Sequence, residues 1–130
     1  MLHMEQIHLP SLDFIAGILS IEGSFMWIRQ NKSEIPVFQL KMQPTEKSLL
    51  ELIRLKLGLK EKIYEYNHQK RSYVLLLVRK RSTIENVIIP VFEGRLLGNK
   101  MVQFEDWKNR YFEHKINFIY RQNERKNQLF

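Results

Sequence analysis

One carboxylate near the start of the chain stands out because it ends an almost wholly apolar run. Residues 14–25 read FIAGILSIEGSF, and Glu22 lies between Ile21 and Gly23. Carboxylate oxygens suit a hard divalent cation, and such a cation can serve hydrolytic chemistry. A plainer interpretation is an ion pair between Glu22 and a lysine or arginine of the same chain. The residues taken alone favour this plainer interpretation.

The run before Glu22 predicts a buried helix. Ser11 is a suitable N-cap, Asp13 lies in the first turn, and apolar residues follow on every side. A glutamate in the last turn opposes the helix dipole, which costs about 0.3 to 1 kcal/mol at an exposed site. We therefore expect a compensating partner or cation at Glu22.

Small residues form a stripe along this predicted helix. At about 100° per residue, Ala16, Ser20 and Gly23 fall within about 60° of one another. Such a stripe lets another backbone approach closely, and we expect that backbone to belong to a second copy of the chain, related by a two-fold axis. The two Glu22 side chains would then meet, and a divalent metal ion would relieve their repulsion. The expected dimer interface comprises Leu12, Ala16, Gly17, Leu19, Ser20 and Gly23.

The rest of the chain predicts two hairpins and further helices. Residues 35–43 alternate apolar and polar side chains, as in a half-buried strand, and we pair them with residues 24–32. Residues 46–58 carry leucines at helical spacing and end at a glycine. The other expected elements are a second hairpin at 62–80, a short helix at 82–92 with Ser82 and Glu85 as a capping box, an amphipathic helix at 100–112 and a loose polar tail at 121–130. The predicted fold class is α+β in the order αββαββα, as one domain over residues 1–120.

Composition narrows the class of partner. The 130 residues carry a formal net charge of +7 and are 44% hydrophobic, which predicts a folded domain with a polyanionic partner, nucleic acid ahead of membrane. There is no cysteine, which excludes disulfides and thiolate metal sites. No apolar run reaches the roughly 18 to 20 residues of a membrane span, and the N-terminus lacks a signal-peptide pattern. We expect a soluble intracellular protein, and both a prokaryotic cytoplasm and a eukaryotic organelle fit.

The stretch IAGILSIEG resembles the signature motif of the LAGLIDADG homing endonucleases. Residues 15–17 match its opening, residues 22–23 match its close, and the following Ser-Phe is a common continuation. The similarity extends to the order of the elements, the length, the FQLKMQ strand and the LLGNK segment. Ser20 departs from the motif at its first aspartate, a position that is structural rather than metal-binding in the family.

The resemblance implies a two-fold enzyme to which each single-motif chain supplies one half. In that family the motif helices form the subunit interface, and their terminal carboxylates hold magnesium at the scissile phosphates. Glu22 falls on this acidic position. Family members also place a polar strand-end residue and a lysine near the reacting water, and Gln43 and Lys100 are the candidates here. An ungapped alignment leaves Met42 open for the first role, and a displaced LLGNK leaves Gly98 open for the second; Lys100 as a plain helix-start cation is an equal alternative.

Two hairpins from each protomer are expected to form a basic saddle in the major groove of DNA. Glutamine can pair with adenine, and lysine with guanine or phosphate. An ordinary solvated sheet face would carry similar residues, and only the motif makes DNA readout the better explanation. The expected DNA-binding residues are Ser24, Met26, Ile28, Gln30, Lys32, Gln39 and Lys41 on the first hairpin, and Tyr64, Tyr66, His68, Lys70 and Arg71 on the second.

The predicted function is a magnesium-dependent double-strand break in DNA, made by a homodimer at a long pseudo-palindromic site. A maturase-like protein that binds intron RNA is the first alternative. A non-catalytic DNA-binding protein on the same scaffold is the second, and an unrelated basic interaction protein, which would be monomeric, is the third.

Overall fold

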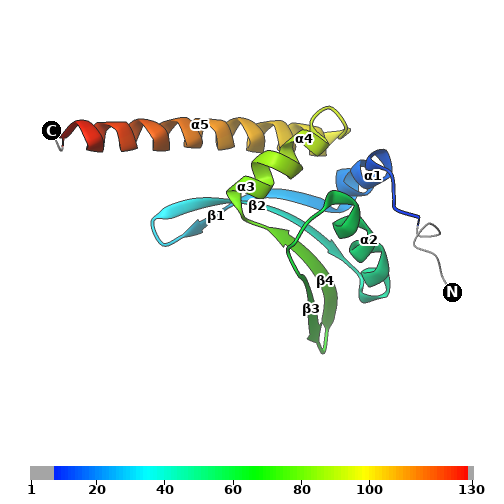
Figure 1. The fold of residues 1–130 in the computed structure, drawn as a ribbon. Helices are drawn as coiled ribbons and strands as arrows, with labels where there is room; N and C mark the ends of the chain where they lie inside the picture. The colour runs from blue at the N-terminus through cyan, green and yellow to red at the C-terminus, as the bar shows by residue number, and fades with distance from the viewer. Residues whose placement is uncertain (1–7, 129–130) are drawn as a thin grey trace.

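The helices pack on one face of a single antiparallel sheet, as Figure 1 shows. A computed structural model describes residues 8–128, with side chains as far as residue 117. The predicted α+β class and the order of helices and hairpins are confirmed. In chain order the elements are α1 (Leu12–Glu22), β1 (Gly23–Gln30), β2 (Ser33–Met42), a 3-10 turn (Pro44–Glu46), α2 (Lys47–Leu57), β3 (Ile63–His68), β4 (Arg71–Val78), α3 (Arg81–Thr83), a π-helical turn (Ile84–Ile88), α4 (Ile89–Phe92) and α5 (Asn99–Gln128).

Helix α1 begins and ends where its sequence indicates. The Ser11 hydroxyl accepts a hydrogen bond from the Phe14 backbone N–H at 3.1 Å, which confirms the N-cap. At the other end, a Cβ on Gly23 would lie 2.3 Å from Leu19 Cδ2. Only glycine therefore lets the chain pass from α1 into β1 without a linker, and this junction fixes the position of Glu22.

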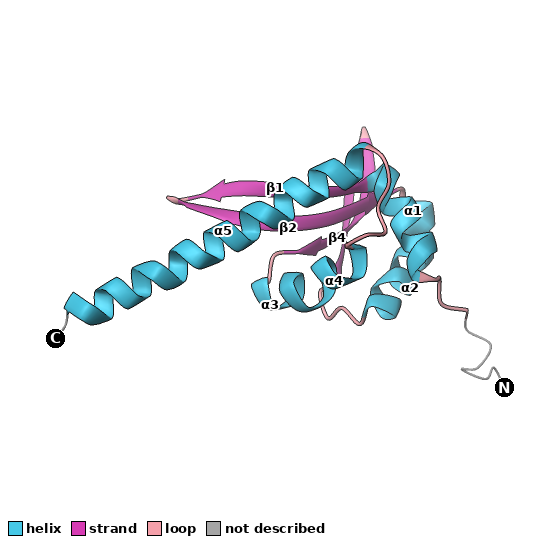
Figure 2. Ribbon diagram, turned by 90° about the horizontal axis from the view of Figure 1, so that it is seen from above, coloured by secondary structure: helices cyan, strands magenta, loops and turns pink. Residues whose placement is uncertain are grey.

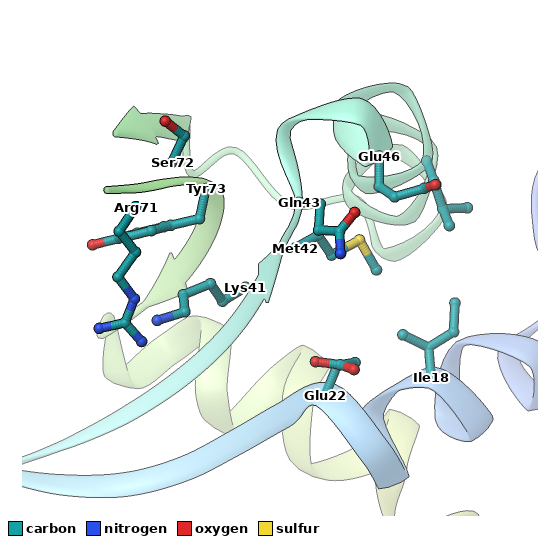
Figure 3. A pocket seen from close by; sticks show the side chains of 10 residues that line it. Ile18, Glu22, Lys41, Met42, Gln43, Glu46, Arg71, Ser72 and Tyr73 are labelled. Atoms are coloured by element: carbon teal, nitrogen blue, oxygen red, sulfur yellow. The ribbon is translucent and has the colours of Figure 1, made fainter. Parts of the chain in front are cut away.

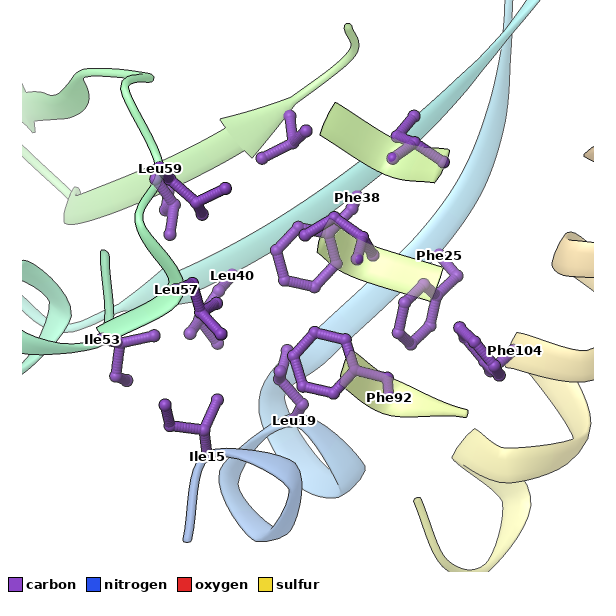
Figure 4. Packing of buried hydrophobic residues seen from close by; sticks show 14 of the residues in the cluster. Ile15, Leu19, Phe25, Phe38, Leu40, Ile53, Leu57, Leu59, Phe92 and Phe104 are labelled. Atoms are coloured by element: carbon purple, nitrogen blue, oxygen red, sulfur yellow. The ribbon is translucent and has the colours of Figure 1, made fainter. Parts of the chain in front are cut away.

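The sheet has the strand order β1-β2-β4-β3, and its register decides which side chains face the helices. Phe25 pairs with Phe38, and Leu40 pairs with Leu76. These side chains lie in the core with residues of α1, α2, the π-helical turn, α4 and α5, as the close-up in Figure 4 shows in part. Alternate residues point to the opposite face, which no helix within residues 8–128 covers (Figure 1).

The two hairpins share only a short paired stretch and then diverge. β2 pairs with β4 from Phe38 to Met42, whereas the hairpin of β1 and β2 continues to a two-residue turn at Asn31 and Lys32. Asn31 has φ 58°, as a tight hairpin turn requires. Figure 1 shows the two hairpin tips pointing in different directions, the tip of β1 and β2 to the left and the tip of β3 and β4 downward. The sheet is therefore curved, as the predicted saddle requires.

The predicted capping box at Ser82 and Glu85 is wrong. The helical region begins at Arg81 without a side-chain cap, and a π-helical turn interrupts it. Glu85 instead accepts a hydrogen bond from the Tyr111 hydroxyl at 2.9 Å and pairs with Lys115. Because the Tyr111 side chain is buried, its hydroxyl needs a partner, and this contact with α5 replaces the local cap.

Helix α5 is longer than predicted. Residues 121–128 continue the helix instead of forming a loose tail; residues 129–130 lie outside the described part of the chain. The reason is local, since residues 99–128 contain neither glycine nor proline and are rich in good helix formers. Figures 1 and 2 show α5 crossing over β1 and β2, where Trp107 Nε1 donates to the Met26 carbonyl at 2.9 Å. Among the residues described, no helix combines the length and apolarity of a membrane span.

Candidate nucleic-acid interface and catalytic pocket

Glu22 opens into a pocket between the end of α1 and the uncovered face of the sheet. The pocket has a volume of about 540 Å³. Glu22 enters it from α1, Lys41 and Gln43 enter from the end of β2, and Tyr73 enters from β4 (Figure 3). Within the described chain, Glu22 is exposed and forms no ion pair, so the predicted alternative of a same-chain salt bridge is wrong. An accessible, unneutralised carboxylate is thus held at the sheet surface.

The end of β2 brings both candidate strand-end residues to this pocket. Met42 is half-buried and packs partly against the core, as the alternation of β2 dictates. Gln43 follows the last residue of β2 and is exposed. Of the two candidates, Gln43 is therefore the one that brings a hydrogen-bonding side chain to the pocket.

Lys100 lies beside Glu22 but not in its pocket. Its Nζ donates a hydrogen bond to the backbone carbonyl of Gly23 at 2.5 Å. The other candidate for the lysine position, Gly98, has φ 68° and precedes α5. The ammonium of Lys100 is therefore aimed at the α1–β1 junction, and its role near the reacting water stays a prediction.

The chain supplies few ligands for a metal ion. In the part of the chain that is described, no three histidine, cysteine, aspartate or glutamate side chains gather as a metal site. Magnesium is commonly held by only one or two carboxylates, with water and substrate phosphates completing its shell. The exposed oxygens of Glu22 fit this pattern, provided that the remaining ligands come from the substrate or from a second copy of the chain.

The register places the predicted DNA-binding residues together on the uncovered face. Ser24 pairs with Gln39, and His68 pairs with Arg71, on the side opposite the helices. Lys32 and Lys70 lie in the two hairpin turns. The predicted residues that lie on this face within the strands are Ser24, Met26, Ile28, Gln30, Gln39, Lys41, Tyr64, Tyr66, His68 and Arg71.

Tyr73 belongs to this face and was missed by the sequence analysis. Its ring lies 4.5 Å from Lys41 Nζ and stacks on Tyr66 at 4.8 Å between centroids. The run Val74–Leu77 shows no alternation, so the sequence could not indicate which β4 residues face outward. The outward direction of Tyr73 follows from the pairing of β4 with β2, and this pairing is seen only in the folded sheet.

The predicted stripe of α1 lies mostly inside the chain. Ala16 is 1% exposed, Leu19 is fully buried and Gly23 is buried. These three residues have little surface to offer a partner, because the sheet and α5 cover that side of the helix. Leu12 and Ser20 are partly exposed, and Gly17 is open. The apolar side chains that α1 leaves exposed are Phe14, at 50%, and Ile21, at 79%.

Comparison with known proteins supports the resemblance. The model of the LAGLIDADG endonuclease family matches residues 15–111 of the chain. The chain belongs to the LAGLIDADG endonuclease family. The matched residues include Glu22, Lys41, Gln43, Tyr73 and Lys100. No curated protein matched the chain.

Solved structures share the fold of this LAGLIDADG chain. I-GzeII in complex with its DNA target is 24% identical with a TM-score of 0.75, over 89% of this chain and 40% of that one. I-LtrWI bound to target DNA is 26% identical with a TM-score of 0.72, over 82% and 38%. The homing endonuclease I-TnaI is 20% identical with a TM-score of 0.74, over 85% and 77%. The chain thus spans about two fifths of the length of the two DNA-bound proteins.

Proposed function

We propose that this LAGLIDADG chain cleaves both strands of double-stranded DNA at a long, roughly palindromic site, as a magnesium-dependent homodimer. The observation that carries the proposal is the exposed, unpaired carboxylate of Glu22, in a pocket that opens onto the uncovered sheet face. The formal charge of +7 favours a polyanionic substrate. Lys41 and Arg71 in the same pocket are suited to phosphate oxygens.

Magnesium would be held by Glu22 together with substrate phosphate oxygens. When bound, it supplies positive charge that neutralises the reacting oxygens and favours ionisation of water. Gln43 would hydrogen-bond the attacking water and orient it. In the hydrolysis, a water oxygen forms a bond to phosphorus, one ester P–O bond breaks, and a proton from the water ends on the departing oxygen.

A homodimer is proposed because the chain carries one motif helix, which brings one Glu22 to one pocket; Glu46 lines the same pocket from the turn before α2 and supplies no second site. Two strand breaks in one duplex call for two sites, and a two-fold pair of chains would present two Glu22 side chains. The surface available for pairing is the side of α1 that carries Phe14, Gly17 and Ile21, which recur at helical spacing. Gly17 would allow close approach of the partner helix. Such a dimer is expected to recognise two similar half-sites.

The test is a cleavage selection on a randomised duplex library with magnesium, followed by sequencing of the ends. The parent is compared with Glu22→Gln and with Asp13→Asn. Asp13→Asn is the control, because it removes one negative charge from the same helix at the end that is far from the pocket. We expect the parent and Asp13→Asn to select one roughly palindromic site and Glu22→Gln to bind it without cutting. Equal cleavage by Glu22→Gln would overturn the role of Glu22. A folded, dimeric parent that cuts nothing would overturn the nuclease and favour intron RNA binding or non-catalytic DNA binding.

A further inference from the structure

We infer that Lys41 is a catalytic cation of the Glu22 pocket, in addition to the lysine position that the family resemblance implies, and that Tyr73 is the residue that positions it. Lys41 would contact the phosphate being cleaved, in addition to any share in DNA binding. The inference rests on the proposed function, since it assigns the charge that stabilises the phosphate during DNA cleavage.

The position of Lys41 is the first argument. It lies on β2 two residues before Gln43, and both line the pocket that holds Glu22 (Figure 3). Its partner across the sheet, Leu75, is 9% exposed, so the stem of Lys41 runs beside apolar surface while its charged end reaches the pocket. A phosphate drawn to Glu22 through a metal ion would therefore come close to this ammonium.

The contact with Tyr73 is the second argument. Lys41 Nζ lies 4.5 Å from the centre of the Tyr73 ring. The Tyr73 ring is in turn stacked with the ring of Tyr66. A ring face attracts an ammonium without neutralising it, whereas a carboxylate partner would remove its charge. No carboxylate pairs with Lys41 among the residues described. The charge is therefore oriented in advance and still available to a phosphate, which is the arrangement that stabilises a transition state best.

The other cations near the pocket are held differently. Lys100 donates to the Gly23 carbonyl and does not line the pocket. Arg71 lines it, but it is exposed beside the hairpin turn and no aromatic ring holds it. Lys41 combines pocket position with a restraint on its charged end.

The experiment separates binding from cleavage on the duplex that the parent selects. The variants are Lys41→Met, Lys41→Arg, Tyr73→Phe and Tyr73→Leu, with Lys56→Met on exposed α2 as the matched loss of charge. Affinity is measured without divalent metal at several salt concentrations, and the single-turnover cleavage rate is measured at saturating protein with magnesium. Circular dichroism checks that each variant is folded.

We expect Lys41→Met to cleave about 100-fold more slowly at saturation, as when one transition-state donor is removed. Its affinity should fall by less, with a shallower salt dependence. Tyr73→Phe keeps the ring and should cleave like the parent, whereas Tyr73→Leu should lose roughly tenfold in rate. Lys41→Arg should recover part of the rate, and Lys56→Met should match the parent.

Two results would overturn the inference alone. In one, Lys41→Met binds weakly but cleaves at the parental rate when saturated, which would make Lys41 a binding residue only. In the other, Tyr73→Leu cleaves as fast as Tyr73→Phe, which would remove the positioning role. A parent protein that cuts no duplex is a different failure, because it overturns the proposed function itself.

Discussion

Lys100, the second residue of α5, donates a hydrogen bond from Nζ to the backbone carbonyl of Gly23, the residue directly after Glu22. The last helix thus holds the junction at which the first helix becomes the first strand. This contact joins residues far apart in the chain and supports the position of the carboxylate on which the proposed cleavage depends.

Replacing Lys100 with methionine should therefore destabilise the protein and slow cleavage together. The Gly23 carbonyl would lose a charged donor, and we expect the free energy of unfolding to fall by about 1.5 to 2 kcal/mol. Urea denaturation measures this effect, with Lys56→Met as control. If Lys100→Met keeps the parental stability but no longer cleaves, Lys100 acts at the phosphate rather than through Gly23.

Gly17→Ala should stabilise the monomer and weaken the dimer. A Cβ at Gly17 meets nothing within 4 Å in its own chain, and alanine in a helix is favoured over glycine by about 0.5 to 1 kcal/mol. A closely packed partner helix would clash with the added methyl, which we expect to raise the dimer dissociation constant roughly tenfold. Sedimentation velocity measures that constant, and Ser48→Ala on exposed α2 serves as control. Unchanged dimerisation would place the interface elsewhere.

Apolar side chains on the first hairpin should make the protein sensitive to thymine methyl groups. Ile28 is 38% exposed and pairs with Ile35 on the uncovered face, and Met26 lies on the same face two residues earlier in β1. Side chains of this type contact the thymine methyl in the major groove. Replacing such a thymine with deoxyuridine removes only the methyl and should weaken binding about fourfold, from about 0.8 kcal/mol per buried carbon.

The methyl experiment has an internal control. Ile28→Ala should bind the thymine and deoxyuridine duplexes equally, whereas the parent should distinguish them. A parent that binds both duplexes alike at every thymine of the selected site would show that the apolar residues only fill the sheet surface.

Glu85 should contribute to stability at neutral pH and lose this contribution in acid. Hydrogen bonds from Lys115 and Tyr111 hold the pKa of Glu85 below its usual 4.5, while burial and Glu85 raise the pKa of Tyr111 to about 12. Because the folded-state pKa of Glu85 is lowered, its stabilisation is present above pH 4.5 and is lost as the pH falls through the folded value.

The measurement compares unfolding of the parent and Glu85→Gln in urea as a function of pH. The ion pair of Glu85 and Lys115 is partly exposed, so water screens it. We therefore expect Glu85→Gln to lower the free energy of unfolding by only about 1 kcal/mol near neutral pH, and this difference should shrink below pH 4.5. Glu113→Gln, on the exposed side of α5, controls for the change in net charge. A difference that grows in acid would contradict the assigned sign.

The sequence by itself determined where most elements begin and end, and that Glu22 closes the first helix. Ser11 and Gly23 mark the two ends of α1 through contacts with near neighbours. The alternation from Phe38 to Met42 showed which face of β2 is apolar. These signals are local, because caps, close approaches and periodicity depend on residues only a few positions apart.

Only the tertiary structure decided which surfaces remain available. The buried side of α1 carries Ala16 and Leu19 because the sheet and α5 cover it, and the uncovered side carries Gly17. Tyr73 reaches Lys41 through the register of β4 on β2, and Lys100 reaches Gly23 across the whole domain. Each of these outcomes depends on which distant segment packs against which face, and a pattern of neighbouring residues does not encode that choice.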